Sequence, residues 1–120
     1  MARNDYNVIV FKFLKYLYTC LINGEKVEVD ALSWDTGYFP GDKTYWEYVW
    51  EHLFTEGLVE NVTVIPVDNR NPMIHLNDTV RISPKGIEFL EENKMMKKVA
   101  DVFAKQGIVG NAIGILQLFM

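Results

Sequence analysis

The sequence has little of what most catalytic and metal sites are built from. It contains a single cysteine, Cys20, and two histidines, His52 and His75. One cysteine excludes an internal disulfide and a multi-cysteine metal site. Cys20 lies in an apolar helical pattern, which is typical of a buried structural thiol rather than a nucleophile. His52 and Glu56 have the i, i+4 spacing of metal ligands, but no third ligand accompanies them. We therefore expect no enzyme activity, no metal site and no cofactor.

Long hydrophobic runs and a secretory leader are also lacking. The first residues, MARNDYNVIV, do not have the basic-then-apolar layout and the small-residue cleavage site of a signal peptide. The apolar tail, IVGNAIGILQLFM, has about 13 residues, fewer than the roughly 20 that a helix needs to span a bilayer. We therefore expect a cytoplasmic protein without a membrane segment.

Basic charge is scarce in the middle of the chain. No arginine occurs between Arg3 and Arg70, and residues 25–60 carry nine acidic and two basic side chains, a net charge of −7. The whole chain has a net charge of −4. This balance provides no general attraction to nucleic acid or to anionic lipid.

What the chain does have is the composition of one globular domain. It is 120 residues long, with 49% hydrophobic and 23% charged residues, which excludes wholesale disorder. We expect a domain over residues 1–107 and an apolar C-terminal tail over residues 108–120.

The first half of the chain predicts two main helices. Residues 5–23 are apolar on most of the helix circumference, with Asp5 as the N-cap, so this helix needs cover on more than one side. The alternation in KVEV (26–29) predicts a short edge strand, and one or two helical turns can follow it. A longer helix over residues 42–56 ends at Gly57 as a left-handed C-cap. Its apolar face comprises Trp46, Val49, Trp50, Leu53 and Phe54.

The second half predicts a hairpin and further helices. Residues 58–67 and 73–82 read as two antiparallel strands joined by the turn DNRNP. In ISPKGIEFLEEN, Ser83 is the expected N-cap and Pro84 the first helical residue. We expect Gly86 to let this helix approach a neighbouring backbone, and Asn93 to break the chain before a second, lysine-rich helix.

This order of elements, with one motif, indicates a family. RISPKGIEFLEEN resembles the strand-to-helix signature that follows the wing of many bacterial winged-helix proteins, through Ile82, Ser83, Lys85, Gly86, Phe89 and Leu90. The chain resembles the YjcQ family of small prophage-associated winged-helix proteins over most of residues 5–105. The resemblance implies an α+β fold, a winged helix-turn-helix with a two-stranded wing and additional C-terminal helices. It implies a phage setting but no catalytic or binding residues.

Two functions are open for such a fold, and protein binding is slightly favoured. The helix that would enter the major groove carries carboxylates, which work against phosphate binding. An acidic, tyrosine-bearing face suits a protein partner instead, and half-buried packing is the alternative interpretation. The candidate protein-binding residues are Thr44, Tyr45, Glu47, Tyr48 and Glu51.

DNA binding is the second hypothesis, as part of a transcriptional regulator. A single arginine at the wing tip can enter a minor groove, and lysines of the C-terminal helix can line the phosphates. The candidate DNA contacts are Arg70, Lys94, Lys97 and Lys98. Solvated surface charge is the alternative interpretation for all four.

The apolar surface of the first helix and of the tail predicts an association between them. Leaving both in water would expose more apolar area than a monomer usually does. We expect the tail to dock on the first helix, within one chain or across a two-fold axis, with a homodimer favoured. The expected contact residues are Phe11, Tyr18, Ile113 and Leu116.

Overall fold

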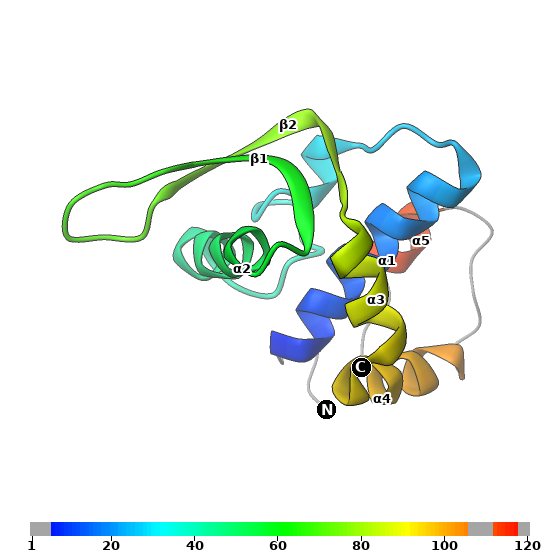
Figure 1. The fold of residues 1–120 in the computed structure, drawn as a ribbon. Coiled ribbons are helices and arrows are strands. Elements are labelled where there is room, and N and C mark those ends of the chain that lie inside the picture. The colour runs from blue at the N-terminus through cyan, green and yellow to red at the C-terminus, as the bar shows by residue number, and fades with distance from the viewer. Residues whose placement is uncertain (1–5, 106–111, 118–120) are drawn as a thin grey trace.

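The computed structural model describes residues 6–105 and 112–117. The elements follow the order α1 (Tyr6–Asn23), the 3-10 helix η1 (Val29–Leu32), α2 (Lys43–Thr55), β1 (Val59–Ile65), β2 (Met73–Ile82), α3 (Pro84–Glu92), α4 (Lys94–Ala104) and α5 (Ile113–Leu116). The strands form one antiparallel two-stranded sheet. Figure 1 shows this hairpin as a wing beside α2, with the other helices around α1. The predicted α+β fold is confirmed, and the arrangement is that of a winged-helix-like domain.

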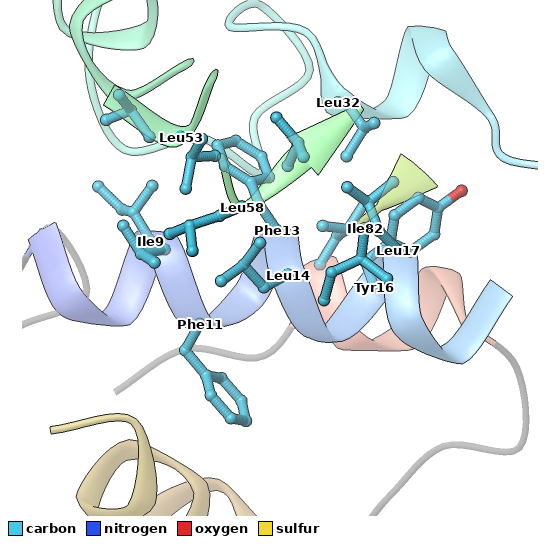
Figure 2. Packing of buried hydrophobic residues seen from close by; sticks show 14 of the residues in the cluster. Ile9, Phe11, Phe13, Leu14, Tyr16, Leu17, Leu32, Leu53, Leu58 and Ile82 are labelled. Carbon is cyan, nitrogen blue, oxygen red and sulfur yellow. The ribbon is translucent and has the colours of Figure 1, made fainter. Parts of the chain in front are cut away.

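Helix α1 is the centre of the hydrophobic core. It contacts α2, α3, α4, α5 and β2, so the predicted cover on more than one side is present. Figure 2 shows Ile9, Phe13 and Leu17 directed towards residues from α2 and the sheet, whereas Phe11 points the other way. The ring of Phe11 lies 5.5 Å from that of Phe103 in α4. In the described residues Phe11 thus packs against α4, and its expected contact with the tail stays a prediction.

The predicted edge strand at residues 26–29 does not form. The only strands in the described part of the chain are β1 and β2, and a 3-10 helix begins at Val29. The backbone N–H of Glu28 instead donates to the hydroxyl of Tyr16 at 2.9 Å. Val27 and Val29 are half-buried against the core. Alternation therefore marks a loop that packs every second side chain on the hydrophobic core, a pattern that a half-buried strand shares.

Helix α2 begins and ends where its sequence signals lie. The carboxylate of Asp42 accepts from the N–H of Tyr45, and Gly57 has the left-handed φ of +74°. Trp46, Val49, Trp50 and Leu53 are buried as expected. Phe54 is 43% exposed, so its placement on the core face is wrong. It lies at the edge of the apolar stripe, where the neighbouring elements do not cover it.

The junction after the wing is built by close contacts around α3. Ser83 caps α3 by accepting from the N–H of Gly86 at 2.9 Å, and its hydroxyl donates to the carbonyl of Gly57 at 2.5 Å. A Cβ on Gly86 would collide with the carbonyl oxygen of Leu58. The expected close approach of Gly86 to a neighbouring backbone is confirmed. Asn93 ends α3 and caps α4 through its side chain, as the predicted chain break requires.

The described part of the tail lies against α1 of the same chain. Helix α5 contacts α1, and Ile115 and Leu116 are buried while Ile113 is half-buried. This is the first of the two arrangements that the sequence left open. Tyr18 is half-buried, with Lys15 Nζ 5.9 Å from its ring centroid. The predictions for Asp5 and for the rest of residues 108–120 fall outside the described residues. The homodimer stays a prediction.

Among the described residues, no helix combines the length and the apolar content that crossing a bilayer requires.

Candidate functional site

Two residues from the competing site predictions, Glu47 and Arg70, form an ion pair in which one guanidinium nitrogen donates to both carboxylate oxygens. The terminal nitrogen Nη2 of Arg70 lies 2.9 Å from Oε1 and 2.7 Å from Oε2 of Glu47. The side chain of Glu47 is 3% exposed and that of Arg70 is 46% exposed. The pair joins the turn of the wing to the first half of α2.

The burial of Glu47 corrects its predicted position. The helical pattern placed this carboxylate on the outward face of α2, but the wing covers it. Burying a carboxylate is costly unless a charged donor neutralises it. Glu47 can be buried because it has such a donor, which the sequence pattern does not reveal. Arg70 supplies that donor, so the wing tip points its guanidinium at α2.

Further contacts hold the wing turn in the same place. The side-chain amide of Asn71 donates to the carbonyl oxygen of Thr44 at 2.9 Å, and Pro72 is buried. The guanidinium Nε of Arg70 also donates to the carbonyl oxygen of Asn71 at 3.0 Å. The start of α2 and the wing turn therefore make one joined surface, with the exposed Thr44 at its edge.

Tyr48 stands at the centre of a second feature, on the exposed side of α2. Its side chain is 45% exposed. Its ring lies 4.3 Å from that of His52 and 6.2 Å, edge to face, from that of Tyr6 at the start of α1. The Nδ1 atom of His52 is 2.9 Å from the carbonyl oxygen of Tyr48, which can only accept, so Nδ1 donates. This bond fixes the imidazole against the tyrosine ring.

Two carboxylates flank these rings. Glu51 is half-buried and Glu56 is exposed, and both lie within one helical turn of Tyr48 or His52. In residues 6–105 and 112–117, the ion pairs found are those of Arg70 with Glu47 and of Arg81 with Glu60, so Glu51 and Glu56 have no cationic partner there. We call the group formed by Tyr6, Tyr48, Glu51, His52 and Glu56 the Tyr48 corner.

In the Tyr48 corner, Tyr6 is neutral and the negative charge comes from the carboxylates. Burial, and then the negative charge of Glu56, raise the pKa of Tyr6 to about 12. Tyr6 therefore stays protonated at physiological pH and contributes a ring rather than a charge. Tyr45, the remaining member of the predicted protein-binding set, is half-buried with its ring 5.7 Å from that of Phe39. This contact packs Tyr45 against the loop before α2.

The predicted DNA contacts occupy two separate places. Lys94, Lys97 and Lys98 are exposed on α4, as expected for either solvated charge or phosphate contacts. Figure 1 shows α4 at the end of the molecule away from the wing. Arg70 belongs to the wing turn and pairs with Glu47. The structure therefore does not bring Arg70 and the three lysines together.

Chemistry-bearing residues outside these surfaces do not converge. The described residues contain no group of three side chains that could hold a metal ion. Cys20 is buried, and burial raises the pKa of its thiol, which disfavours the nucleophilic thiolate. Sequence reasoning missed Tyr6 and His52 as neighbours of Tyr48. The i, i+4 spacing of Tyr48 and His52 was the available signal for one of them, whereas nothing in the sequence indicates the contact from α1.

Comparison with known protein families agrees with this fold. The family described as YjcQ protein matches residues 11–106, and the chain therefore belongs to the YjcQ family. No curated protein and no solved structure matches the chain.

Proposed function

We propose that this member of the YjcQ family is a non-enzymatic regulatory or adaptor module that binds a protein partner through α2 and the adjoining wing turn. The observation that carries the proposal is the ion pair between Arg70 and Glu47. It engages the one arginine of the wing turn with the protein's own carboxylate. It also fixes the wing on α2, which presents a rigid surface without an ordering cost on binding.

The charge of this surface supports a protein partner over DNA. Glu51 and Glu56 are unneutralised within the described residues, and phosphates would be repelled where a major-groove helix should sit. Tyr48 adds an exposed tyrosine ring, one of the residue types enriched among the residues that carry binding energy in protein interfaces. The proposal keeps the cytoplasmic location and the prophage setting that the sequence predicted.

A titration with random-sequence duplex DNA at low salt tests the proposal. We expect no submicromolar binding. Submicromolar binding that weakens steeply with salt would overturn it, because this salt dependence is the signature of phosphate neutralisation.

A photo-crosslinking residue in place of the exposed Thr44 provides the positive test, in cells that contain the natural partner. We expect an adduct that protease degrades and nuclease leaves intact. The matched control places the same crosslinker at the exposed Glu91 of α3, away from the proposed surface, and should give no such adduct.

DNA binding is the second candidate function, favoured by the exposed lysines of α4. If it is correct, Lys94→Gln, Lys97→Gln and Lys98→Gln together should abolish duplex binding and reduce its salt dependence. Arg70→Gln should then have a smaller effect than these three changes, because Arg70 is paired with Glu47.

A further inference from the structure

The Tyr48 corner combines two groups that bind cations in different ways. The exposed ring of Tyr48 offers an aromatic face, and the carboxylates of Glu51 and Glu56 offer negative charge within a helical turn of the rings. An aromatic face attracts a cation through its quadrupole, and a carboxylate attracts it through its charge and accepts its hydrogen bonds.

We propose that the Tyr48 corner binds an arginine side chain presented by the protein partner. The inference rests on the proposed function and specifies the partner's chemistry. A guanidinium is planar, so it can stack on the tyrosine ring while its edge donates to a carboxylate. A lysine ammonium can make either contact but lacks the planar fork that makes both at once.

The arginine–glutamate pairs within the chain show which carboxylates of α2 remain available to a partner. Arg70 already pairs with Glu47 on the neighbouring strip of α2, and Arg81 pairs with Glu60 in the wing. The carboxylates of the Tyr48 corner are the acceptors on α2 that these internal arginines leave unused. Lys43 is the one lysine or arginine of α2, and it lies at the start of the helix, more than a turn before Tyr48.

Contacts within the corner already hold the aromatic rings in position, which favours binding of a partner. His52 is held against Tyr48 by the bond from its Nδ1 atom to the Tyr48 carbonyl oxygen, and Tyr6 contacts the Tyr48 ring edge to face. Tyr48 contacts both rings and still has about half of its surface exposed to a partner. These contacts reduce the side-chain entropy that the rings lose when a partner docks.

The test is a nuclear magnetic resonance titration of the full chain with a short peptide of alternating arginine and glycine, at low salt. Peptides with lysine or glutamate in place of arginine serve as comparisons. We expect the arginine peptide to shift the backbone amide signals around Tyr48 and His52 and that of Tyr6. We expect the lysine peptide to bind more weakly and the glutamate peptide not to bind.

Variants with matched controls assign the contacts. Glu51→Gln with Glu56→Gln should weaken the arginine peptide about tenfold, as expected for two partly exposed ion pairs. Glu91→Gln with Glu92→Gln, which removes two exposed carboxylates from α3, should leave binding unchanged. Tyr48→Ala should weaken binding about threefold through the lost cation–π contact, whereas Phe54→Ala on the same helix should not.

Three results would overturn the inference. The first is a titration that leaves the signals of α2 unmoved. The second is equal weakening by the α2 and α3 glutamine pairs, which would show general attraction to a negative surface. The third is equal affinity for lysine and arginine peptides. If crosslinking from position 44 still gives a protein adduct, any of these results overturns only the arginine proposal and not the proposed function. Crosslinked adducts that nuclease degrades would instead overturn the proposed function itself.

Discussion

Arg70 and Glu47 join the wing to α2 through two hydrogen bonds from one guanidinium nitrogen, at 2.7 and 2.9 Å. The pair is asymmetric, because the carboxylate side chain is 3% exposed and the guanidinium side chain 46% exposed. Water can therefore solvate Arg70 when its partner is removed, but it cannot solvate Glu47 in the same way. The two residues should respond differently to substitution.

We predict that Arg70→Ala destabilises the fold more than Glu47→Gln does. Arg70→Ala leaves a buried carboxylate without a donor and should cost about 2–3 kcal/mol. Glu47→Gln removes the charge and keeps the shape, at a cost of about 1 kcal/mol. The double variant should be more stable than Arg70→Ala alone. Urea denaturation of the three variants measures these free energies of unfolding.

The pair of Arg81 and Glu60 supplies the control. It has the same shortest distance, 2.7 Å, but its side chains are 60% and 40% exposed. Arg81→Ala should therefore cost less than about 1 kcal/mol. Equal losses for Arg70→Ala and Arg81→Ala would show that burial of Glu47 does not matter.

Gly86 provides a prediction in which two effects oppose each other. Gly86→Ala gains about 0.5–1 kcal/mol of helix propensity. The new Cβ would collide with the carbonyl oxygen of Leu58 and lie 2.7 Å from Cγ1 of Ile82. Because a backbone oxygen cannot rotate away, the overpacking cost of about 1–3 kcal/mol should win.

Thermal unfolding of Gly86→Ala should therefore show a lower midpoint than the wild type. Glu88→Ala, at an exposed position of the same helix, is the control and should be nearly neutral. A stabilised Gly86→Ala variant would mean that α3 can move away from Leu58 at little cost.

The parts of the fold that the sequence predicted depend on local chemistry. Gly57, Ser83 and Asn93 each act on their own or adjacent helix termini, and each has the predicted role in the structure. The wing strands are also apparent from residue type and turn signals. Such features require no knowledge of what lies across the core.

The features that the sequence did not predict are contacts between distant segments. Periodicity shows which side Glu47 occupies on α2, but not that Arg70, 23 residues further on, covers it. The same limit applies to Tyr6, which reaches Tyr48 from another helix. At residues 26–29 the alternation was real, but its cause was packing of a loop on the hydrophobic core rather than strand pairing.

Tyr6 makes the stability of the fold decrease at alkaline pH. Burial, and then Glu56, raise its pKa to about 12, above the value near 10 of an unfolded tyrosine. The folded state therefore binds the proton more tightly. The resulting stability is complete below about pH 10 and is lost as the pH rises towards 12. Tyr16, whose pKa burial also raises, acts in the same direction.

We predict that Tyr6→Phe loses less stability than the wild type over this pH range. Urea denaturation at several pH values measures the difference, and the remaining loss in the variant reports the other tyrosines, Tyr16 included. Parallel curves for the two proteins would contradict the assigned environment of Tyr6.

If the protein forms a homodimer, its interface has to involve apolar residues other than Phe11 and Leu116. Phe11 and Leu116 are buried within one chain, whereas Leu21 and Ile22 at the end of α1 are 51% and 64% exposed. We predict that light scattering gives twice the chain mass of 13.9 kDa, and that Leu21→Ser with Ile22→Ser returns it to one chain. A wild-type mass of 13.9 kDa at micromolar concentration would rule out the dimer.

The packing of α5 on α1 predicts that the tail is needed for a stable fold. Leu116 is 2% exposed and lines a small cavity together with Ile9, Phe13 and Phe39. Leu116→Ala should cost about 2–4 kcal/mol, because burial is lost and a cavity is left. Truncation after Lys105 should go further, exposing this side of α1 and causing aggregation.

Chemical denaturation of Leu116→Ala and the solubility of the truncated chain measure these effects. Gln117→Ala is the matched control, since Gln117 is exposed and the one hydrogen bond described for its side chain runs 3.3 Å from Nε2 to the hydroxyl of Tyr38. It should cost less than about 1 kcal/mol. A truncated chain as soluble and heat-stable as the full one would show that α1 does not need α5, and that the apolar side of α1 at Ile9 and Phe13 is sufficiently covered by α2 and the loop before it.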